Sequence, residues 1–378
     1  MRIKNVSLKN YRNIEAAEID FMDGINILIG ENANGKTNAV EAIYHFAQGK
    51  SFRTKNSMET ISFDKENCDL SLDFIVDKSG RTNQMNIKLY TDKSKKFYYN
   101  DSQVKKVVEF IGNFRAVLFT PDHLGLVKSN PETRRRFIDM AISQIKPVYL
   151  SYLIDCNRIL TQRNYLLKHI KKTGETEEKL SQFNIWTKKL AKYSAVISRY
   201  RGEYIERLKE FVPEFYRGLS NGREEIKLSY VSNINKFNRE FADFHDYVTC
   251  EGLYNEVFSK CGKEELAAGT TLYGPQRDDL YIEIDDRSAR VIASQGQQRS
   301  AVLALKLAEG DISKISHGEY PVFLLDDILS ELDHNRQDFI LRSLSERQVI
   351  ITCCNSELLN GVDISISKMI KVENGIFK

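Results

Sequence analysis

Short apolar and alternating runs, separated by turns, occupy the first third of the chain. Runs rich in β-branched and aromatic residues are typical of strands. The segments concerned are IKNVSLKNY, INILIG, LSLDFIV, MNIKLY, KFYYN and RAVLFT. One helical pattern interrupts them, beginning after the glycine-rich GENANGKT and running through NAVEAIYHF. This part of the chain is therefore predicted to be mostly β-structure around a single helix.

The middle of the chain has the period of long helices. No further proline occurs between Pro147 and Phe211, and the glycines there are Gly174 and Gly202. Positions spaced by three and four form two stripes: Leu150, Leu153, Asn157, Leu160, Asn164 and Leu167, then Phe183, Trp186, Leu190, Tyr193, Ile197, Tyr200, Tyr204, Arg207 and Phe211. This seven-residue repeat predicts two helices paired as an antiparallel hairpin, an arm roughly 40 Å long. Two ordinary helices of a globular bundle are the alternative.

The last third returns to strand–helix alternation. Residues 213–265 are mixed and polar, and predict short helices with a strand near KLSYV. After residue 271 the segments DLYIEID, SAVLALKLAEGDISK, VFLLDD and RQVIITC predict strand, helix, strand and strand. This order is typical of half of a parallel α/β sheet. We therefore expect an α/β head formed by residues 1–140 and 266–378, with a helical domain, residues 141–265, inserted between its halves.

Composition excludes several classes of protein. The 378 residues are 42% hydrophobic and 28% charged, as in ordinary globular proteins. No apolar run approaches the ~20 residues that span a bilayer, and the basic N-terminus lacks the apolar region of a secretory signal. We therefore expect a cytoplasmic protein with no membrane association. Neither CxxC nor HExxH occurs, so the six cysteines are expected to be reduced thiols rather than zinc ligands.

Charge is distributed unevenly. Residues 151–220 hold 14 Lys and Arg against 8 Asp and Glu, an excess of +6, within a chain whose net charge is +3. A basic middle on a nearly neutral body favours a polyanionic partner such as nucleic acid.

A phosphate-binding loop is the strongest chemical motif. The sequence GENANGKT matches GxxxxGK[ST] between a predicted strand and a predicted helix, the context that this motif requires. Its glycines allow backbone N–H groups to face phosphates, Lys36 reaches the β- and γ-phosphates, and Thr37 offers a hydroxyl to Mg²⁺. The predicted ATP-binding residues are Gly30, Glu31, Asn32, Ala33, Asn34, Gly35, Lys36 and Thr37.

A pair of carboxylates follows the apolar run VFLL. Open α/β sheets bind ligands at the carboxyl ends of their strands, where Asp326 and Asp327 would lie. Asp326 is predicted to complete the Mg²⁺ ligands with Thr37. Asp327 is predicted to orient or deprotonate the attacking water, so Asp327 and Lys36 are the candidate catalytic residues. A strand followed by a helix-capping Asp is the structural alternative.

Two further motifs carry a family resemblance. SQGQQR, with Ser294, Gln295, Gly296 and Gln297, looks like the signature motif of ABC-type ATPases, and SELD at 330–333 looks like their D-loop. In those proteins the signature of one subunit closes over the γ-phosphate held by another. Lys36 and Ser294 are 258 residues apart, far more than in a transporter ATPase.

The whole chain resembles the RecF family of recombination mediator ATPases. The segments that carry the resemblance are NYRN, GKSFRT, FTPDHL, ETRRRFID, YGPQRDDL, SQGQQR and LLDDILSELD. It implies an ABC-type P-loop head, with a mixed sheet and an antiparallel β subdomain, plus the inserted helical arm. It also implies an ATP-dependent homodimer that clamps double-stranded or gapped DNA, and cooperation with RecR and RecO in loading RecA. Recombinational repair and replication restart are the expected processes, with Arg12 and Asn13 near the nucleotide and Arg53 near the phosphates.

Some positions depart from the family pattern. Gln276 stands in GPQRDD where these proteins usually carry His, and ITCCNS has no His after the last core strand. Thr352 can donate a hydrogen bond near the γ-phosphate but cannot shuttle a proton as His does. Asp327 also reaches less far than the Glu of transporters. We therefore expect a weak ATPase that acts mainly as a switch, and the family resemblance implies that DNA stimulates it.

The basic run Arg134, Arg135 and Arg136 is the candidate DNA contact, with a solvated helix face as its alternative. Arg277 and Asp278 are expected to form an ion pair that supports the site. The rival functions are an ABC-type subunit energising a membrane transporter, a short SMC-like structural ATPase, and an ATP-gated nuclease. The spacing of the signature disfavours the first, and the nuclease would need a further acidic domain.

Overall fold

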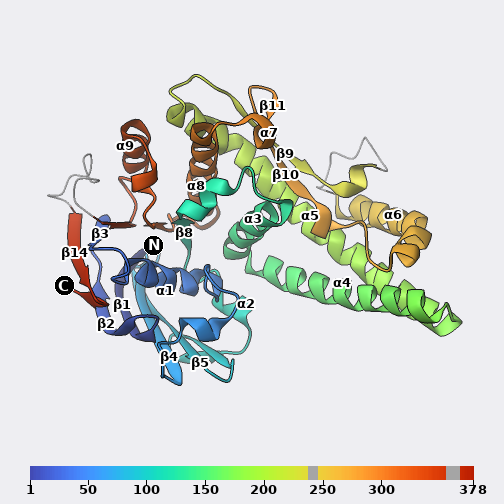
Figure 1. Ribbon diagram of the computed structural model, residues 1–378, viewed down its shortest axis with the longest axis horizontal. Helices are drawn as coiled ribbons and strands as arrows, with labels where there is room; N and C mark the ends of the chain where they lie inside the picture. The colour runs from blue at the N-terminus through green and yellow to red at the C-terminus, as the bar shows by residue number, and fades with distance from the viewer. Residues whose placement is uncertain (237–245, 355–366) are drawn as a thin grey trace. The chain divides into compact units, whose positions relative to one another are not determined.

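The computed structural model describes residues 1–236, 246–354 and 367–378 (Figure 1). The chain divides into two compact units. The first, here called the head unit, consists of Met1–Val127, Phe211–Glu225 and Ala293–Lys378. The second, the arm unit, consists of Lys128–Glu210 and Ile226–Ile292.

A mostly parallel sheet forms one layer of the head unit, in the order β15-β14-β3-β13-β12-β8. Its strands are β3 (Ile25–Ile29), β8 (Ala116–Phe119), β12 (Val322–Leu325), β13 (Val349–Cys353), β14 (Ser367–Glu373) and β15 (Ile376–Phe377). All are parallel except β15, which pairs antiparallel with β14. Every residue of β8, β12 and β13 is buried, as expected of parallel strands covered on both faces.

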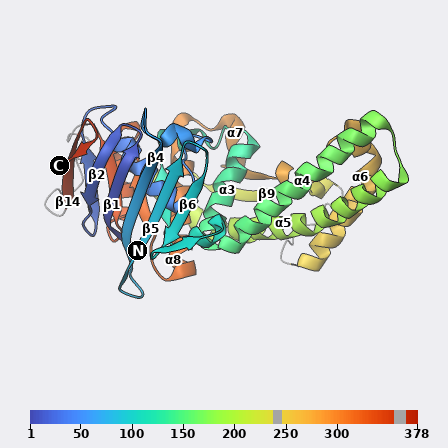
Figure 2. The ribbon, with the colours of Figure 1, turned by 90° about the horizontal axis from the view of Figure 1, so that it is seen from below.

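An antiparallel sheet forms the second layer, in the order β2-β1-β4-β5-β6-β7 (Figure 2). Its strands are β1 (Arg2–Tyr11), β2 (Ile14–Asp20), β4 (Asn67–Val76), β5 (Arg81–Tyr90), β6 (Lys95–Tyr99) and β7 (Ser102–Val104). Leu8, Leu70, Ile87 and Phe97 pair in one row across four strands, and all four are buried. Alternation therefore sets the register, since a slip of one residue would expose this row.

Helices complete the head unit. The helix α1 (Lys36–Gln48) contacts β1, β4 and β5 of the antiparallel sheet and β8 and β13 of the parallel sheet, which explains its burial on almost every side. On α8 (Gln295–His317) a side chain at Gly310 would come within 2.3 Å of the Phe323 ring of β12, so glycine permits this close packing. Shorter elements are α2 (Val107–Phe110), α9 (His334–Ser343), η1 (Ser57–Thr60), η2 (Pro121–Gly125) and η5 (Leu329–Glu331).

The arm unit contains the predicted hairpin. The helices α4 (Pro147–Thr173) and α5 (Glu177–Leu219) lie side by side (Figure 2), and α5 continues into the head unit. Ring centroids are 5.4 Å apart between Tyr149 and Tyr200 and 6.2 Å apart between Tyr152 and Tyr193, which confirms an antiparallel pair. The other elements are α3 (Pro131–Ile145), α6 (Tyr247–Ala268), α7 (Ala289–Ile292), β9 (Ile226–Val231), β10 (Asp279–Ile284), β11 (Arg287–Ser288), η3 (Asn233–Lys236) and η4 (Pro275–Arg277).

The arm unit differs from the sequence-based expectation in two ways. The polar segment 213–265 contains a 22-residue helix, α6, rather than short helices, although the strand near KLSYV is present as β9. Residues 128–140 and 266–292, expected in the head, belong to the arm unit, and residues 211–225, expected in the helical domain, belong to the head unit. The reason is packing: α3 contacts both α4 and β10, and β10 pairs with β9 and β11 in a separate antiparallel sheet.

Candidate nucleotide-binding site

The loop between β3 and α1 has the backbone geometry of an anion site. A Cβ at Gly30 would lie 2.2 Å from the carbonyl oxygen of Val372, so only glycine fits there. Gly35 caps α1 in a left-handed conformation, with φ of 110°, and has no side chain to satisfy the first N–H groups of the helix. These donors and the helix dipole favour a bound phosphate.

Lys36 supplies the cation of this site. Its side chain is buried, and Nζ donates to the carbonyl oxygens of Gly30 at 2.7 Å and Glu31 at 2.9 Å. The ammonium group therefore lies over the loop, where phosphate oxygens can replace these weaker acceptors. The arrangement fits ATP.

Thr37 and Asp326, predicted from segments 289 residues apart in the sequence, are in direct contact. The Thr37 hydroxyl donates to Asp326 Oδ1 at 2.9 Å. Burial raises the pKa of Asp326 to about 6, opposed by the hydrogen bond from Thr37 and reinforced by the neighbouring Asp327 carboxylate. A hydroxyl and a carboxylate are hard oxygen ligands of the kind that Mg²⁺ prefers, and a bound cation would further favour the charged form of this acid.

Asp327 lies beside this pair at the edge of a small cavity. The cavity has a volume of about 200 Å³. Its lining consists of Asn32, Asp327, Leu329, Ser330, Thr352, Cys353 and Cys354. It therefore opens between the phosphate-binding loop and the carboxyl ends of β12 and β13, the place where a water near the γ-phosphate would lie.

A buried acid organises the residues predicted to lie near the nucleotide. Arg12 donates twice to Glu41 of α1, at 3.0 and 2.7 Å, and Arg53 donates to Asn38 at 2.8 Å. Asn13 donates to the carbonyl oxygen of Ala33 at 3.0 Å, so it contacts the phosphate-binding loop itself. The structure thus brings Arg12, Asn13 and Arg53 to the site, although the Arg12 guanidinium is already paired with Glu41.

The signature motif begins α8. Ser294 is the N-cap: its hydroxyl accepts from the backbone of Gln297, whose side chain accepts from the backbone of Ser294. Arg299 donates to Glu331 at 2.9 Å, and Arg336 donates to the hydroxyl of Ser300 at 2.9 Å. Two arginines therefore attach the signature helix to the D-loop segment and to α9, which follows it.

The arginine run is mostly not a surface feature. Arg134 is buried and forms a bidentate ion pair with Asp279, both contacts at 2.7 Å. Arg135 donates to the carbonyl oxygen of Asp278 at 2.7 Å, whereas Arg136 is exposed. The prediction of three adjacent DNA contacts is therefore wrong for Arg134, because this side chain joins α3 to β10.

The expected ion pair between Arg277 and Asp278 is also absent from the described residues. Asp278 is buried and accepts instead from Tyr230, from Ser232 at 2.9 Å and from the backbone of Asn233 at 3.1 Å. Gln276 donates to the carbonyl oxygen of Tyr273 at 2.8 Å. These residues stabilise the arm unit rather than the nucleotide site.

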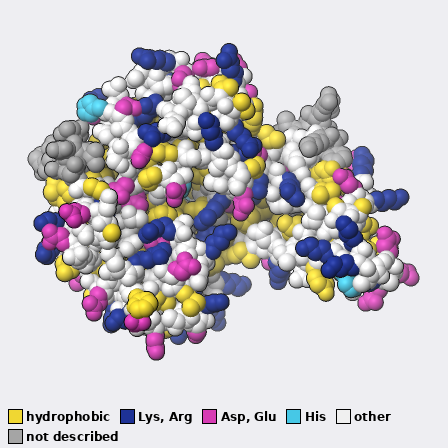
Figure 3. Space-filling view, viewed as in Figure 1, with side chains coloured by type: hydrophobic (Ala, Val, Ile, Leu, Met, Phe, Trp, Pro, Cys, Tyr) yellow, Lys and Arg dark blue, Asp and Glu magenta, His cyan; other side chains and the backbone are white. Residues whose placement is uncertain are grey.

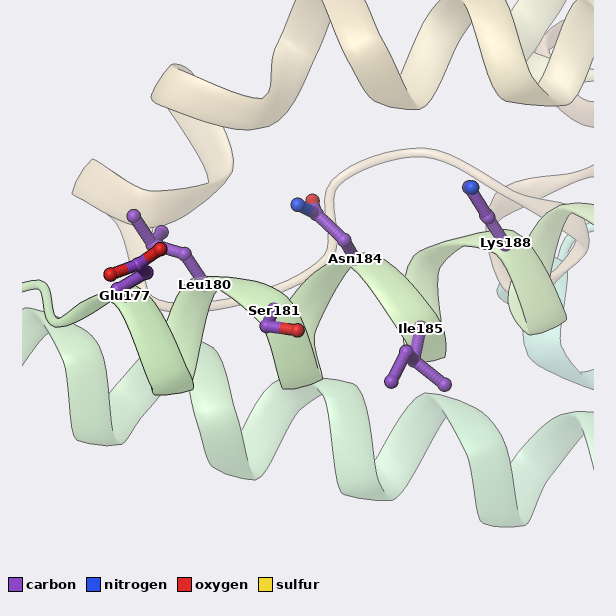
Figure 4. Close-up of a pocket in the computed structure, with 6 residues that line it drawn as sticks. All are labelled: Glu177, Leu180, Ser181, Asn184, Ile185 and Lys188. Carbon is purple, nitrogen blue, oxygen red and sulfur yellow. The ribbon is translucent and has the colours of Figure 1, made fainter.

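A second hollow lies in the arm unit. It has a volume of about 410 Å³ and follows α5 at Glu177, Leu180, Ser181, Asn184, Ile185 and Lys188 (Figure 4). Asn184 and Lys188 project on the same side of the helix. It contains none of the residues predicted for chemistry.

Three features that support the nucleotide-binding site were not predicted from the sequence. Glu41 is a fully buried acid, and its position among the apolar residues Ala39, Val40, Ala42 and Ile43 was the sequence signal for it. The turn Asn374–Gly375 has positive φ at both residues, as an Asn-Gly hairpin turn requires, and Gly375 donates to the carbonyl oxygen of Asn34 at 2.8 Å. The Cys354 thiol lies 2.9 Å from Asn32 Oδ1, a contact between distant segments for which the sequence offers no signal.

The fold and the site together define an ABC-type ATPase head carrying a helical arm. Comparison with known proteins agrees: residues 2–378 match the RecF/RecN/SMC N terminal domain family. The DNA replication and repair protein RecF of Bacillus mycoides (strain KBAB4) is 38% identical over 376 residues, 99% of this chain and 98% of that protein. RecF of Bacillus cereus (strain G9842) has the same identity and coverage. The chain belongs to the RecF family.

Solved structures also place this chain among RecF proteins. The structure of the recombination mediator protein RecF with ATP, of the RecFOR pathway, has a TM-score of 0.89 and 31% identity, covering 100% of this chain and 97% of that one. The Smc head bound to the C-winged helix domain of ScpA has a TM-score of 0.56 at 17% identity, covering 100% and 96%, and shows a shared fold. Within the described residues, no helix is long and apolar enough to cross a bilayer.

Proposed function

We propose that this protein is an ATP-dependent DNA-binding protein of recombinational repair and replication, a Mg²⁺-dependent ATPase that acts mainly as a switch. The observation that carries the proposal is the contact between Thr37 and Asp326 beside Lys36, which joins the phosphate-binding loop to the carboxylate strand. Similarity over the full chain to RecF proteins, including one described with ATP, supports the same activity.

Each residue of the site has a distinct role in this proposal. Lys36 and the N-terminus of α1 neutralise the phosphates, and Thr37 and Asp326 hold Mg²⁺. A bound Mg²⁺ ion supplies positive charge to the phosphate oxygens. Asp327 orients the attacking water, and the short reach of Asp compared with Glu favours slow turnover.

The second half of the site would come from another copy of the chain. The phosphate-binding loop follows β3, whereas α8 packs on β12 and β8, on the far side of β13. Two or three strand spacings separate them, on the order of 10–14 Å. Ser294 and the N-terminus of α8 are therefore proposed to contact the γ-phosphate of a partner subunit, so that ATP produces a dimer.

The ATP-bound dimer would clamp double-stranded DNA at single-strand gaps, and hydrolysis would release it. RecR, RecO and RecA are the partners proposed by family membership.

The charged surface bears on the proposed contact with DNA. Lys and Arg side chains are interspersed with Asp and Glu on the face shown in Figure 3. DNA binding through phosphate contacts should weaken as salt rises.

Complementation between two inactive variants tests the shared site. Ser294→Arg should bind ATP but not dimerise, and Lys36→Ala should not bind ATP. In their mixture each heterodimer has one intact composite site, so ATP hydrolysis should return although neither variant hydrolyses alone. Hydrolysis by monomeric Ser294→Arg, or no recovery in a mixture that forms heterodimers, would contradict the proposal.

A further inference from the structure

One hydroxyl group is shared by the two carboxylates at the end of β12. Thr352 of β13 is buried, and its Oγ lies 3.0 Å from Asp326 Oδ1 and 3.2 Å from Asp327 Oδ1. The same oxygen accepts a hydrogen bond from the backbone N–H of Asp327 at 2.8 Å. Because a hydroxyl has one proton, Thr352 can donate to only one of the carboxylates at a time.

The backbone at Asp327 needs this contact. Its φ is 50°, in the left-handed region. For a residue other than glycine this conformation costs roughly 1–2 kcal/mol. The hydrogen bond from its N–H to Thr352 satisfies a donor at this turn and fixes the turn against the neighbouring strand. Ser330 adds a second restraint by donating to the carbonyl oxygen of Asp327 at 2.7 Å.

The two carboxylates do not depend equally on Thr352. Asp326 Oδ1 also accepts from Thr37 at 2.9 Å. Among the residues that the structure describes, Thr352 alone donates to the carboxylate of Asp327. Although the Thr352 oxygen lies slightly nearer to Asp326, loss of its hydroxyl would leave Asp326 with the donor Thr37. The same loss would leave the Asp327 carboxylate with no donor among the described residues, so the orientation of Asp327 depends more on Thr352.

We infer that Thr352 is a positioning residue for hydrolysis, which sets the turn and the carboxylate direction of Asp327 and contributes little to ATP binding. This inference rests on the proposed function of Asp327 in orienting water. Without the hydroxyl, Asp327 would sample orientations that do not direct the water, and small misplacements in such a site slow the chemical step.

Two substitutions separate the hydroxyl from the shape of the side chain. Thr352→Val keeps the volume and removes the hydroxyl, whereas Thr352→Ser keeps the hydroxyl. We expect Thr352→Val to lower kcat for ATP by about tenfold or more, with the affinity for a fluorescent ATP analogue and Mg²⁺ changed by less than about twofold. Thr352→Ser should keep kcat within about threefold of the unmodified protein.

Amide hydrogen exchange without nucleotide gives a readout that is independent of activity. The Asp327 amide should exchange slowly in the unmodified protein and in Thr352→Ser, and faster in Thr352→Val. The inference would be overturned by an unchanged kcat in Thr352→Val, by an equal decrease of kcat in Thr352→Val and Thr352→Ser, or by loss of ATP binding in Thr352→Val. If the unmodified protein does not hydrolyse ATP but the exchange pattern holds, the proposed ATPase function fails while the contact at Asp327 stands.

Discussion

At the scale of single residues, Asp327 combines a left-handed backbone with a carboxylate at the edge of a cavity. Asp327→Asn keeps the shape of the side chain and removes its charge. We expect ATP hydrolysis to fall by about tenfold or more, while ATP binding persists and ATP-induced dimers last longer. Steady-state hydrolysis and the dimer lifetime in gel filtration would measure this, and hydrolysis at the normal rate would show that another group orients the water.

His45 of α1 is a buried base that the proposed chemistry does not use. Burial, with a smaller contribution from the positive charge of Lys95, lowers its pKa to about 3. The folded state therefore resists protonation, whereas the unfolded chain takes up a proton below its ordinary value of 6.5. Stability should fall as the pH drops from 6.5 towards 3, by ~2 kcal/mol at pH 5 compared with pH 7.5.

A comparison with His45→Phe tests this effect. The free energy of unfolding, measured by denaturant titration at pH 7.5 and pH 5, should decrease less in His45→Phe than in the unmodified protein. For each protein, the change in the free energy of unfolding between pH 7.5 and pH 5 is measured. The difference between these two changes reports on His45 alone, because the other titrating groups contribute equally to both proteins. An equal decrease in the unfolding free energy of both proteins would mean that His45 accepts a proton in the folded state.

At the scale of elements, α3 presents arginines in two different environments. Arg136 is exposed, whereas Arg134 is paired with Asp279 of β10. Arg136→Ala should reduce the slope of log affinity against log salt for duplex DNA by about one, if Arg136 contacts a phosphate. Arg134→Ala should instead destabilise the arm unit, on the order of 2–3 kcal/mol, because Asp279 loses its partner.

Two measurements separate these effects. DNA affinity at several salt concentrations reports on Arg136, and thermal unfolding reports on Arg134. If the dependence of DNA affinity on salt is unchanged in Arg136→Ala, Arg136 does not contact a phosphate and is part of a solvated helix face. Unaltered stability in Arg134→Ala would show that the ion pair with Asp279 contributes little.

At the scale of the whole molecule, the proposed switch is a change of oligomeric state. The signature and the phosphate-binding loop lie over different strands of one sheet, and in the proposed mechanism a complete site is therefore formed by two chains. Sedimentation should therefore show a monomer without nucleotide and a dimer with ATP and Mg²⁺, while Lys36→Ala remains monomeric in both. Lys9→Ala, at an exposed position of β1, is the matched control. Dimers of Lys36→Ala in ATP would show that association does not need the nucleotide.

Local patterns in the sequence determined much of this protein. Alternation and apolar runs predicted the head strands β1, β3, β4, β5, β6, β8, β12 and β13, and the seven-residue repeat predicted the helical hairpin. The phosphate-binding loop and the Asp pair were recognisable because their chemistry requires fixed residue types at short spacing. Family resemblance then connected these pieces to one fold.

Only the tertiary structure decided which distant residues meet. Arg134 looked like part of a surface run, but its neighbour Asp279 lies 145 residues away and removes it from solvent. The sequence placed Thr352 near the γ-phosphate, but its contacts with Asp327 appear only when parallel pairing places β13 beside β12. Side-chain partners of this kind depend on the packing of elements far apart in the chain, which no local pattern of hydrophobic and polar residues encodes.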